Sequence, residues 1–155
     1  MLTENFSLSE FLISQEAART GRVLEPTPEV VANLTRLGTD VLEPIRAAVG
    51  PIHISSGFRP EWLNDLVGGS KNSQHLTGCA ADIHVAGKTP YELACVIRNL
   101  KLIPLNQCIL EFPPNGWVHV SVAELGAEPK RQFLTSRLKD HRTVYSTGLS
   151  ERVLV

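Results

Sequence analysis

The spacing of apolar residues changes once along this 155-residue chain, at Val49-Gly50-Pro51, and this change limits the fold more than any other feature. Before it, apolar residues recur at helical intervals, as in an amphipathic helix. After it, short apolar stretches are separated by Gly, Pro, Asn and Ser, which is typical of strands joined by turns. The sequence therefore predicts an α+β domain in which helices lead and a small, mostly antiparallel sheet follows.

Two helical segments are expected before the change. The capping box Ser7 to Glu10 begins the first, and Thr27-Pro28 supplies the N-cap and first position of the second. Pro44 falls inside the second pattern and predicts a kink or break near Glu43. We interpret this half as scaffold, and its core-facing positions are Val30, Val31, Leu34, Leu37, Val41, Leu42 and Ile45.

Turn residues delimit short elements in the rest of the chain. The Gly69–Gln74 stretch reads as a polar loop and Pro113–Gly116 as a tight turn. With 43% hydrophobic and 20% charged residues, the chain has the composition of one globular domain, and we expect 1–155 to form it. The expected strands are 52–56, 80–85, 107–112 and 117–122, and the expected helices are 60–66 and 89–100.

The last segment, residues 129–155, differs in charge. It holds six basic and two acidic residues, a balance of +4 in a chain whose net charge is -1. Phe133–Thr135 and Thr143–Tyr145 are predicted to form short edge strands, with charged side chains guarding the exposed edge. A solvated basic edge and a patch that attracts an anionic polymer both fit this pattern. The overall charge argues against a dedicated nucleic-acid binder.

The cysteines and the first residues of the chain indicate where the protein is made. Three cysteines without a Cys-x-x-Cys pair are expected to be buried free thiols, which suits a reducing compartment. No basic and apolar leader follows Met1, and no apolar run has the length of a membrane span. We therefore expect a protein made in the cytoplasm without a signal peptide and without a membrane partner.

Two histidines, His75 and His119, occur where packing does not readily explain them. His75 follows the polar loop, and Gly78 allows a sharp turn before the strand that carries Asp82. Alternation in Trp117–Val122 places His119 opposite a valine face that suits the core. Two His and one Asp are a common ligand set for one catalytic Zn²⁺, with the fourth position left for water. The spacing alone also fits a chance arrangement.

Three segments resemble the M15 peptidase family: Ser55–Arg59 (SSGFR), Ser70–Ile83 (SKNSQHLTGCAADI) and Trp117–Ser121 (WVHVS). The family pattern SxHxxGxAxD and a later WxH-type strand are present in order, and the similarity covers roughly residues 5–125. The family includes zinc D-Ala-D-Ala carboxypeptidases, dipeptidases and phage endolysins that act on cell-wall peptides. The resemblance implies the small α+β fold shared with the hedgehog signalling domain, around one Zn²⁺ ion held by His75, Asp82 and His119.

Further roles follow from the same resemblance. Arg59 matches the arginine that in relatives faces the carbonyl or carboxylate of the substrate, which suits a permanently charged planar donor. The alternative for Arg59 is a surface ion pair with Glu61 or Asp65. The remaining expected substrate contacts are Ser73 and Gln74, for which loop capping is the alternative, and Trp117 as a wall of the cleft.

The sequence departs from the family at the general base. Many relatives carry Glu or Asp three residues before the last zinc His, where this chain has Gly116. We predict that Glu111, on the preceding strand, is the base; the alternatives are a cross-strand ion pair or no base at all. His84 is a weaker candidate for acid or transition-state support, or a plain surface residue. His53 and His141 are expected at the surface or core edge, and Cys79 in packing.

These observations favour a monomeric zinc metallopeptidase that cuts peptidoglycan stem peptides or cross-links, as a carboxypeptidase or an endopeptidase. The missing leader favours a phage-type lytic enzyme, delivered to the wall by a holin or with a virion. The alternative function is a non-catalytic zinc-binding module that recognises wall peptides or assembles into a virion. Nucleic-acid binding through the basic tail is a third, poorly supported reading. Both leading hypotheses predict bound zinc, so turnover separates them.

Overall fold

One mixed sheet organises the molecule, and the computed structural model describes residues 1–152. Its six strands lie in the order β1-β2-β4-β3-β5-β6, and every neighbouring pair is antiparallel except β3 and β5. The predicted α+β class with a mostly antiparallel sheet is confirmed. The strands are β1 (His53–Ser56), β2 (Ala80–His84), β3 (Leu105–Glu111), β4 (Trp117–Val122), β5 (Gln132–Lys139) and β6 (Arg142–Thr147).

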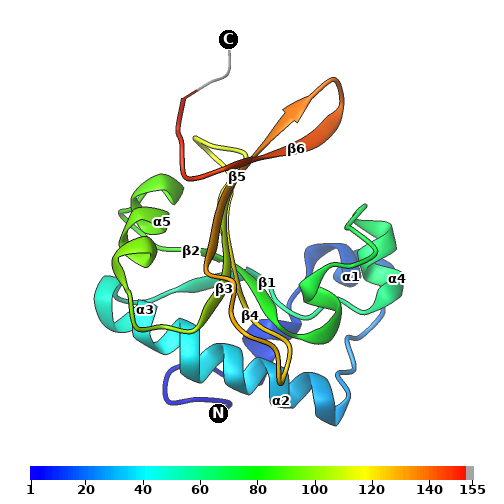
Figure 1. Cartoon of the computed structure of the whole chain (residues 1–155). Coiled ribbons are helices and arrows are strands. Elements are labelled where there is room, and N and C mark those ends of the chain that lie inside the picture. Colours follow the sequence, from blue (N-terminus) through cyan, green and yellow to red (C-terminus); the bar gives the residue numbers. More distant parts are fainter. Residues whose placement is uncertain (153–155) are drawn as a thin grey trace.

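The helices are short and pack on both sides of the sheet. In Figure 1, α3 and α5 lie on one side of the central strands, α1 and α4 lie on the other, and α2 runs below. The elements are the 3₁₀ turns η1 (Leu8–Leu12) and η3 (Gln74–Thr77), the π-helical turn η2 (Gly38–Leu42), and the α-helices α1 (Gln15–Thr20), α2 (Pro28–Leu37), α3 (Glu43–Val49), α4 (Glu61–Leu66) and α5 (Pro90–Asn99).

The core lies between α2, α3, α5 and the sheet. The apolar positions predicted for the second helical segment are buried, except Val31, which is half-buried. They pack in one cluster with the valine face of β4 and with α5. The predicted caps form as well: the Thr27 hydroxyl accepts from the Val30 N–H, and the Thr89 hydroxyl accepts from the Glu92 N–H. These helices therefore cover one face of the sheet, and the core forms between them and that face.

A kink or break was predicted near Glu43, and the break is wrong, because the backbone stays helical from α2 through α3. A single π turn, η2, widens the helix there, and the Glu43 N–H bonds to the Gly38 carbonyl five residues back. Pro44 has no N–H to donate and would crowd the carbonyl one turn earlier in a regular α-helix. A widened turn accommodates that proline without ending the helix.

The C-terminal strands are longer than predicted, and β5 is not an edge strand. It pairs in parallel with β3, from Gln107 opposite Gln132 to Glu111 opposite Ser136. Of these two strands only β6 lies at an edge of the sheet, and the hairpin of β5 and β6 extends past the body of the molecule (Figure 1). Residues 153–155 of the predicted tail lie outside the described residues.

Two smaller expectations concern the membrane and the cysteines. Within residues 1–152, every helix is too short or too polar to cross a bilayer. Cys79 and Cys108 are buried free thiols, as predicted, whereas Cys95 is only half-buried.

Candidate metal centre

Three elements bring the predicted ligands together. His75 lies on η3, which begins at the Ser73 N-cap and ends at Gly78 in a left-handed conformation with φ 78°. Asp82 and His119 face each other across β2 and β4, where they are direct partners in the register. All three side chains are buried, and one ligand atom from each lies within 4.8 Å of the others.

The carboxylate of Asp82 is the centre of this group. Its Oδ1 lies 3.2 Å from Nε2 of His75 and 3.1 Å from Nδ1 of His119. Burial alone would raise the pKa of Asp82, but the charge of His75 and the hydrogen bonds from His119 and His75 hold that pKa well below its usual value. The carboxylate therefore stays ionised in the interior.

The far nitrogen of each imidazole is already occupied. Nδ1 of His75 lies 2.7 Å from the carbonyl oxygen of Gly57, and Nε2 of His119 lies 3.2 Å from Oε1 of Gln74. Both of those oxygens can only accept, so both far nitrogens carry the proton. A neutral imidazole has one N–H, so in the neutral form of each ring the near nitrogen carries a lone pair.

Three lone-pair donors consequently converge on one point. Nε2 of His75 and Nδ1 of His119 both face a carboxylate oxygen, and two lone pairs at about 3 Å repel unless a positive charge lies between them. A divalent cation suits this donor set, because two imidazoles and one carboxylate are ligands that zinc prefers. The residues present thus fit the metal that the sequence predicts.

The cleft beside this group has a volume of about 680 Å³. The ligands His75, Asp82 and His119 form part of its wall, together with Arg59, Glu111 and Trp117. Of the residues predicted to contact substrate, Ser73 and Gln74 also line it. The Trp117 ring packs on Phe112, with ring centroids 5.5 Å apart, and both residues line the cleft.

Arg59 directs its guanidinium toward the cleft and not toward the surface acids. No ion pair joins it to Glu61 or Asp65 within residues 1–152, so the surface alternative is wrong. Its Nη2 donates to the Ser73 hydroxyl at 3.4 Å, and its Nε is buried without a partner among the described residues. Burial lowers the pKa of Arg59, while the charge of Asp82 and then of Glu111 raises it.

Glu111 occupies the position that the sequence analysis assigned to it. It ends β3 opposite Trp117, two pairs beyond Ile109 and His119 in the register. Its carboxylate is buried and accepts a hydrogen bond from the hydroxyl of Ser136. Burial raises the pKa of Glu111, and the hydrogen bond from Ser136 offsets this only in part. A carboxyl group with a raised pKa beside a metal site is suited to proton transfer.

Gly116 has a steric reason for lacking a side chain. A Cβ built there would lie 1.7 Å from the carbonyl oxygen of Glu111 and 2.9 Å from that of Phe112. The turn thus packs directly on the backbone of the strand that carries Glu111. An acid at residue 116 is incompatible with this turn.

Gly116→Ala is expected to destabilise the fold by about 1–3 kcal/mol, because the added methyl group must displace backbone. Asn115→Ala is the matched control, since Asn115 is exposed in the same turn. Urea denaturation of both variants measures the difference. Equal stability of Gly116→Ala and the control would contradict the steric account.

Gln74 contacts a metal ligand. Because its Oε1 accepts from Nε2 of His119, it fixes the tautomer that leaves Nδ1 free for a metal. We expect Gln74→Ala to weaken zinc affinity by about 10–100-fold in competition with a chelator. Gln74→Glu keeps an acceptor and should retain affinity, as should Asn72→Ala on the same loop. Unchanged affinity in Gln74→Ala would show that this contact does not orient the ligand.

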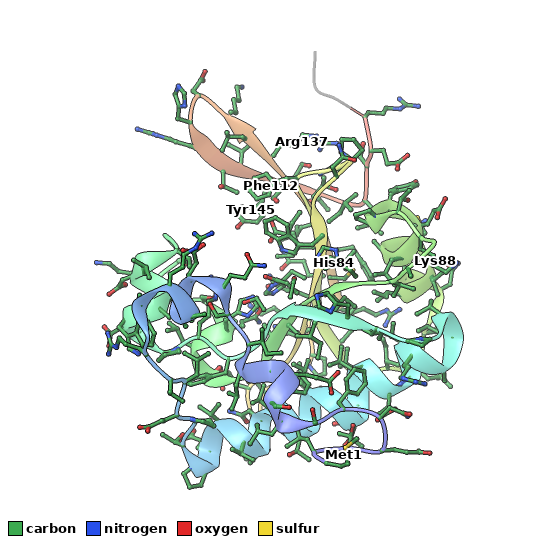
Figure 2. The ribbon with its side chains drawn as sticks, turned by 180° about the vertical axis from the view of Figure 1, so that it is seen from behind. Met1, His84, Lys88, Phe112, Arg137 and Tyr145 are labelled. Atoms are coloured by element: carbon green, nitrogen blue, oxygen red, sulfur yellow. The ribbon has the colours of Figure 1, made fainter. Side chains whose placement is uncertain are left out.

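The other candidate residues lie outside the cleft. His84 packs on Ser55, with Nε2 3.2 Å from its hydroxyl, and its ring lies 6.1 Å from that of His53. Figure 2 shows His84 on β2, apart from Phe112 and Tyr145 near the hairpin. His141 is exposed in the turn between β5 and β6. Cys79 is fully buried beside Arg36.

Two further residues near Glu111 were not predicted, Ser136 on β5 and Tyr145 on β6. They are partners in the register, and Ser136 contacts Glu111. Tyr145 lines the cleft, and burial and the charge of Glu111 raise its pKa. Both strands were predicted in part, but only the parallel pairing with β3 reveals their proximity to the metal ligands.

Sequence comparisons agree with this geometry. The family described as Peptidase M15 matches residues 4–121, which is most of the chain and includes all three ligands. A zinc D-Ala-D-Ala carboxypeptidase of Streptomyces albus G is 40% identical over 60 residues. That alignment covers 37% of this chain and 24% of the relative, so the chain spans about a quarter of the relative's length.

Proposed function

The chain belongs to the Peptidase M15 family, and on that premise we propose that it is a zinc metallopeptidase that hydrolyses peptide bonds in peptidoglycan stem peptides or cross-links. The observation that carries the proposal is the convergence of three lone-pair donors, from His75, Asp82 and His119, in the wall of an open cleft. The similarity to a zinc D-Ala-D-Ala carboxypeptidase supports the choice of metal and of substrate class.

The ligand residues would hold zinc through Nε2 of His75, Oδ1 of Asp82 and Nδ1 of His119. The chemistry that zinc supplies when bound is Lewis-acid polarisation of a carbonyl and activation of a water molecule. The carbonyl of Gly57 and the amide of Gln74 keep both imidazoles in the required tautomer. The protein thus orients the ligands before any metal arrives.

Glu111 is the group that moves the proton. Its raised pKa allows it to take a proton from the attacking water and then to donate it to the leaving amine. Arg59 supplies fixed positive charge at the same cleft, directed at the carbonyl oxygen or the terminal carboxylate of the substrate. Trp117 forms part of the cleft wall and offers an apolar contact to the substrate.

The alternative is a non-catalytic zinc-binding module. Its main support in the sequence was Gly116 at the usual place of the acid. The position of Glu111 in the same cleft supplies an acid from the neighbouring strand, and this favours the enzyme over the binding module.

Mass spectrometry of purified peptidoglycan, incubated with zinc-loaded protein, tests the proposal. New fragments that disappear with a chelator are expected, and their masses identify the bond and separate carboxypeptidase from endopeptidase action. Folded, zinc-loaded protein that produces no fragments would favour the binding module.

A lytic role, with delivery by a holin or a virion, belongs to the same proposal. We expect protein added outside permeabilised bacterial cells to lyse them, and the same protein to leave cells intact when zinc is removed. Cleavage of isolated wall material without lysis would favour a remodelling enzyme.

A further inference from the structure

The C-terminal hairpin forms part of the cleft, although it lies beyond the residues that match the family. The family similarity ends at residue 121, whereas β5 begins at Gln132. Leu134 of β5 and two residues of β6, Thr143 and Tyr145, nevertheless line the cleft. Figure 2 labels Phe112 and Tyr145 in the region where the hairpin leaves the body of the molecule, and both line the cleft.

The parallel register of β3 and β5 places one residue of this hairpin in contact with the carboxylate of Glu111. Ser136 is the direct partner of Glu111. Gln107 and Gln132, the first pair of the same ladder, are hydrogen-bonded through their side chains at 2.8 Å. Alternate residues share a face of a strand, so Gln132, Leu134 and Ser136 point to the cleft side.

The contact between Ser136 and Glu111 is specific. Ser136 is completely buried, and its hydroxyl donates to Oε2 of Glu111. No hydrogen bond from the rest of residues 1–152 holds Oε1, so one carboxylate oxygen is fixed and the other is left for a proton. The hydroxyl also limits rotation of the carboxylate in a cleft where no other hydrogen-bond donor holds it.

We propose that Ser136 is the positioning residue of the proton-transfer group: its hydroxyl holds Oε2 of Glu111 and fixes the orientation of that carboxylate in the cleft. The inference rests on the proposed peptidase function only in naming Glu111 as the base. The inference gives β5, which lies outside the residues that match the family, a part in the reaction.

Other charged and titratable groups also act on Glu111. Burial raises its pKa, the Ser136 hydrogen bond lowers it, and charges on the neighbouring elements contribute less. Because the hydroxyl stabilises the ionised form, its removal must raise the pKa of Glu111 further. The other groups are His119 on β4, Asp82 on β2, Arg59 after β1 and Tyr145 on β6.

The first test is the pH profile of kcat/KM for zinc-loaded Ser136→Ala with a stem-peptide substrate. The acid limb is expected to move to higher pH by about one unit, with lower kcat and unchanged KM. Ser136→Thr retains the hydroxyl and should restore the profile. Thr135→Ala is the matched control, because Thr135 is an equally buried hydroxyl that bonds Gly148 on the opposite face.

The second test does not need turnover. Carbon-13 NMR of protein labelled at the glutamate carboxyl carbons follows the titration of Glu111, whose signal is identified by its loss in Glu111→Gln. A higher pKa in Ser136→Ala than in the wild type and Thr135→Ala is expected. Identical titrations would overturn the inference, even if the protein cleaves peptidoglycan. If the wild-type protein had no activity, the proposed function would be overturned, but the NMR comparison would still test the contact between Ser136 and Glu111.

Discussion

Glu111→Gln is expected to lower kcat by about 10²–10⁴-fold while zinc binding and folding are retained. Glutamine has the shape of glutamate but cannot accept and return a proton. Its amide oxygen can still accept from the buried Ser136 hydroxyl, so no polar group loses its partner. Steady-state kinetics on a stem peptide measures the effect.

The control for this variant is Glu124→Gln, which removes a charge from an exposed loop where Glu124 bonds the Thr77 hydroxyl. It should leave kcat unchanged. Full activity in Glu111→Gln would eliminate Glu111 as the base.

The pH dependence of the wild type should report the same group. Burial places the pKa of Glu111 above its usual value, and a base acts only when ionised. Activity is therefore expected to fall as the pH drops through that raised pKa. The corresponding acid limb should be absent from the residual activity of Glu111→Gln, and its persistence there would assign the limb to another group.

His75→Ala should have the largest effect, with loss of both bound zinc and detectable hydrolysis. The substitution removes one of three ligands, and the two that remain form an incomplete site. The chain is expected to fold, because the hydrophobic core cluster does not include His75. Metal analysis after dialysis measures zinc per chain, and circular dichroism follows the fold.

His84→Ala is the matched control for His75→Ala. His84 is also a histidine near the metal group, two residues after Asp82, but it packs on Ser55 outside the cleft. It should retain zinc and activity. One zinc ion per chain in His75→Ala would refute the ligand assignment, and loss of activity in His84→Ala alone would restore the role in catalysis that the sequence suggested for it.

Local patterns in the sequence predict the metal group well. Alternation in β4 places His119 opposite the valine face, and the glycine after η3 allows His75 to return toward Asp82. Each of these inferences depends on a few neighbouring residues. The antiparallel register of β2 and β4 then completes the site.

The sequence does not predict the wall that β5 and β6 add to the cleft. The pattern within a strand indicates which residues share a face, but it does not indicate which strand lies next to it. Two parallel strands are also not joined by a short turn that the sequence could reveal. Ser136 is therefore inconspicuous in the sequence, although it contacts the most important carboxylate. The π turn before Pro44 is missed for a related reason, because proline usually ends a helix and only the continuous packing of α2 and α3 keeps it intact.

The parallel pairing of β5 with β3 also sets an order of events during synthesis. All three ligands precede residue 120, whereas the strand that holds Glu111 in place begins at Gln132. A chain leaves the ribosome from its N-terminus and its parts fold as they emerge, so the strands that carry the ligands emerge before β5. Docking of β5 is then expected to be a late step, and a chain that ends before Gln132 would have the three ligand residues but lack the Ser136 hydroxyl beside Glu111.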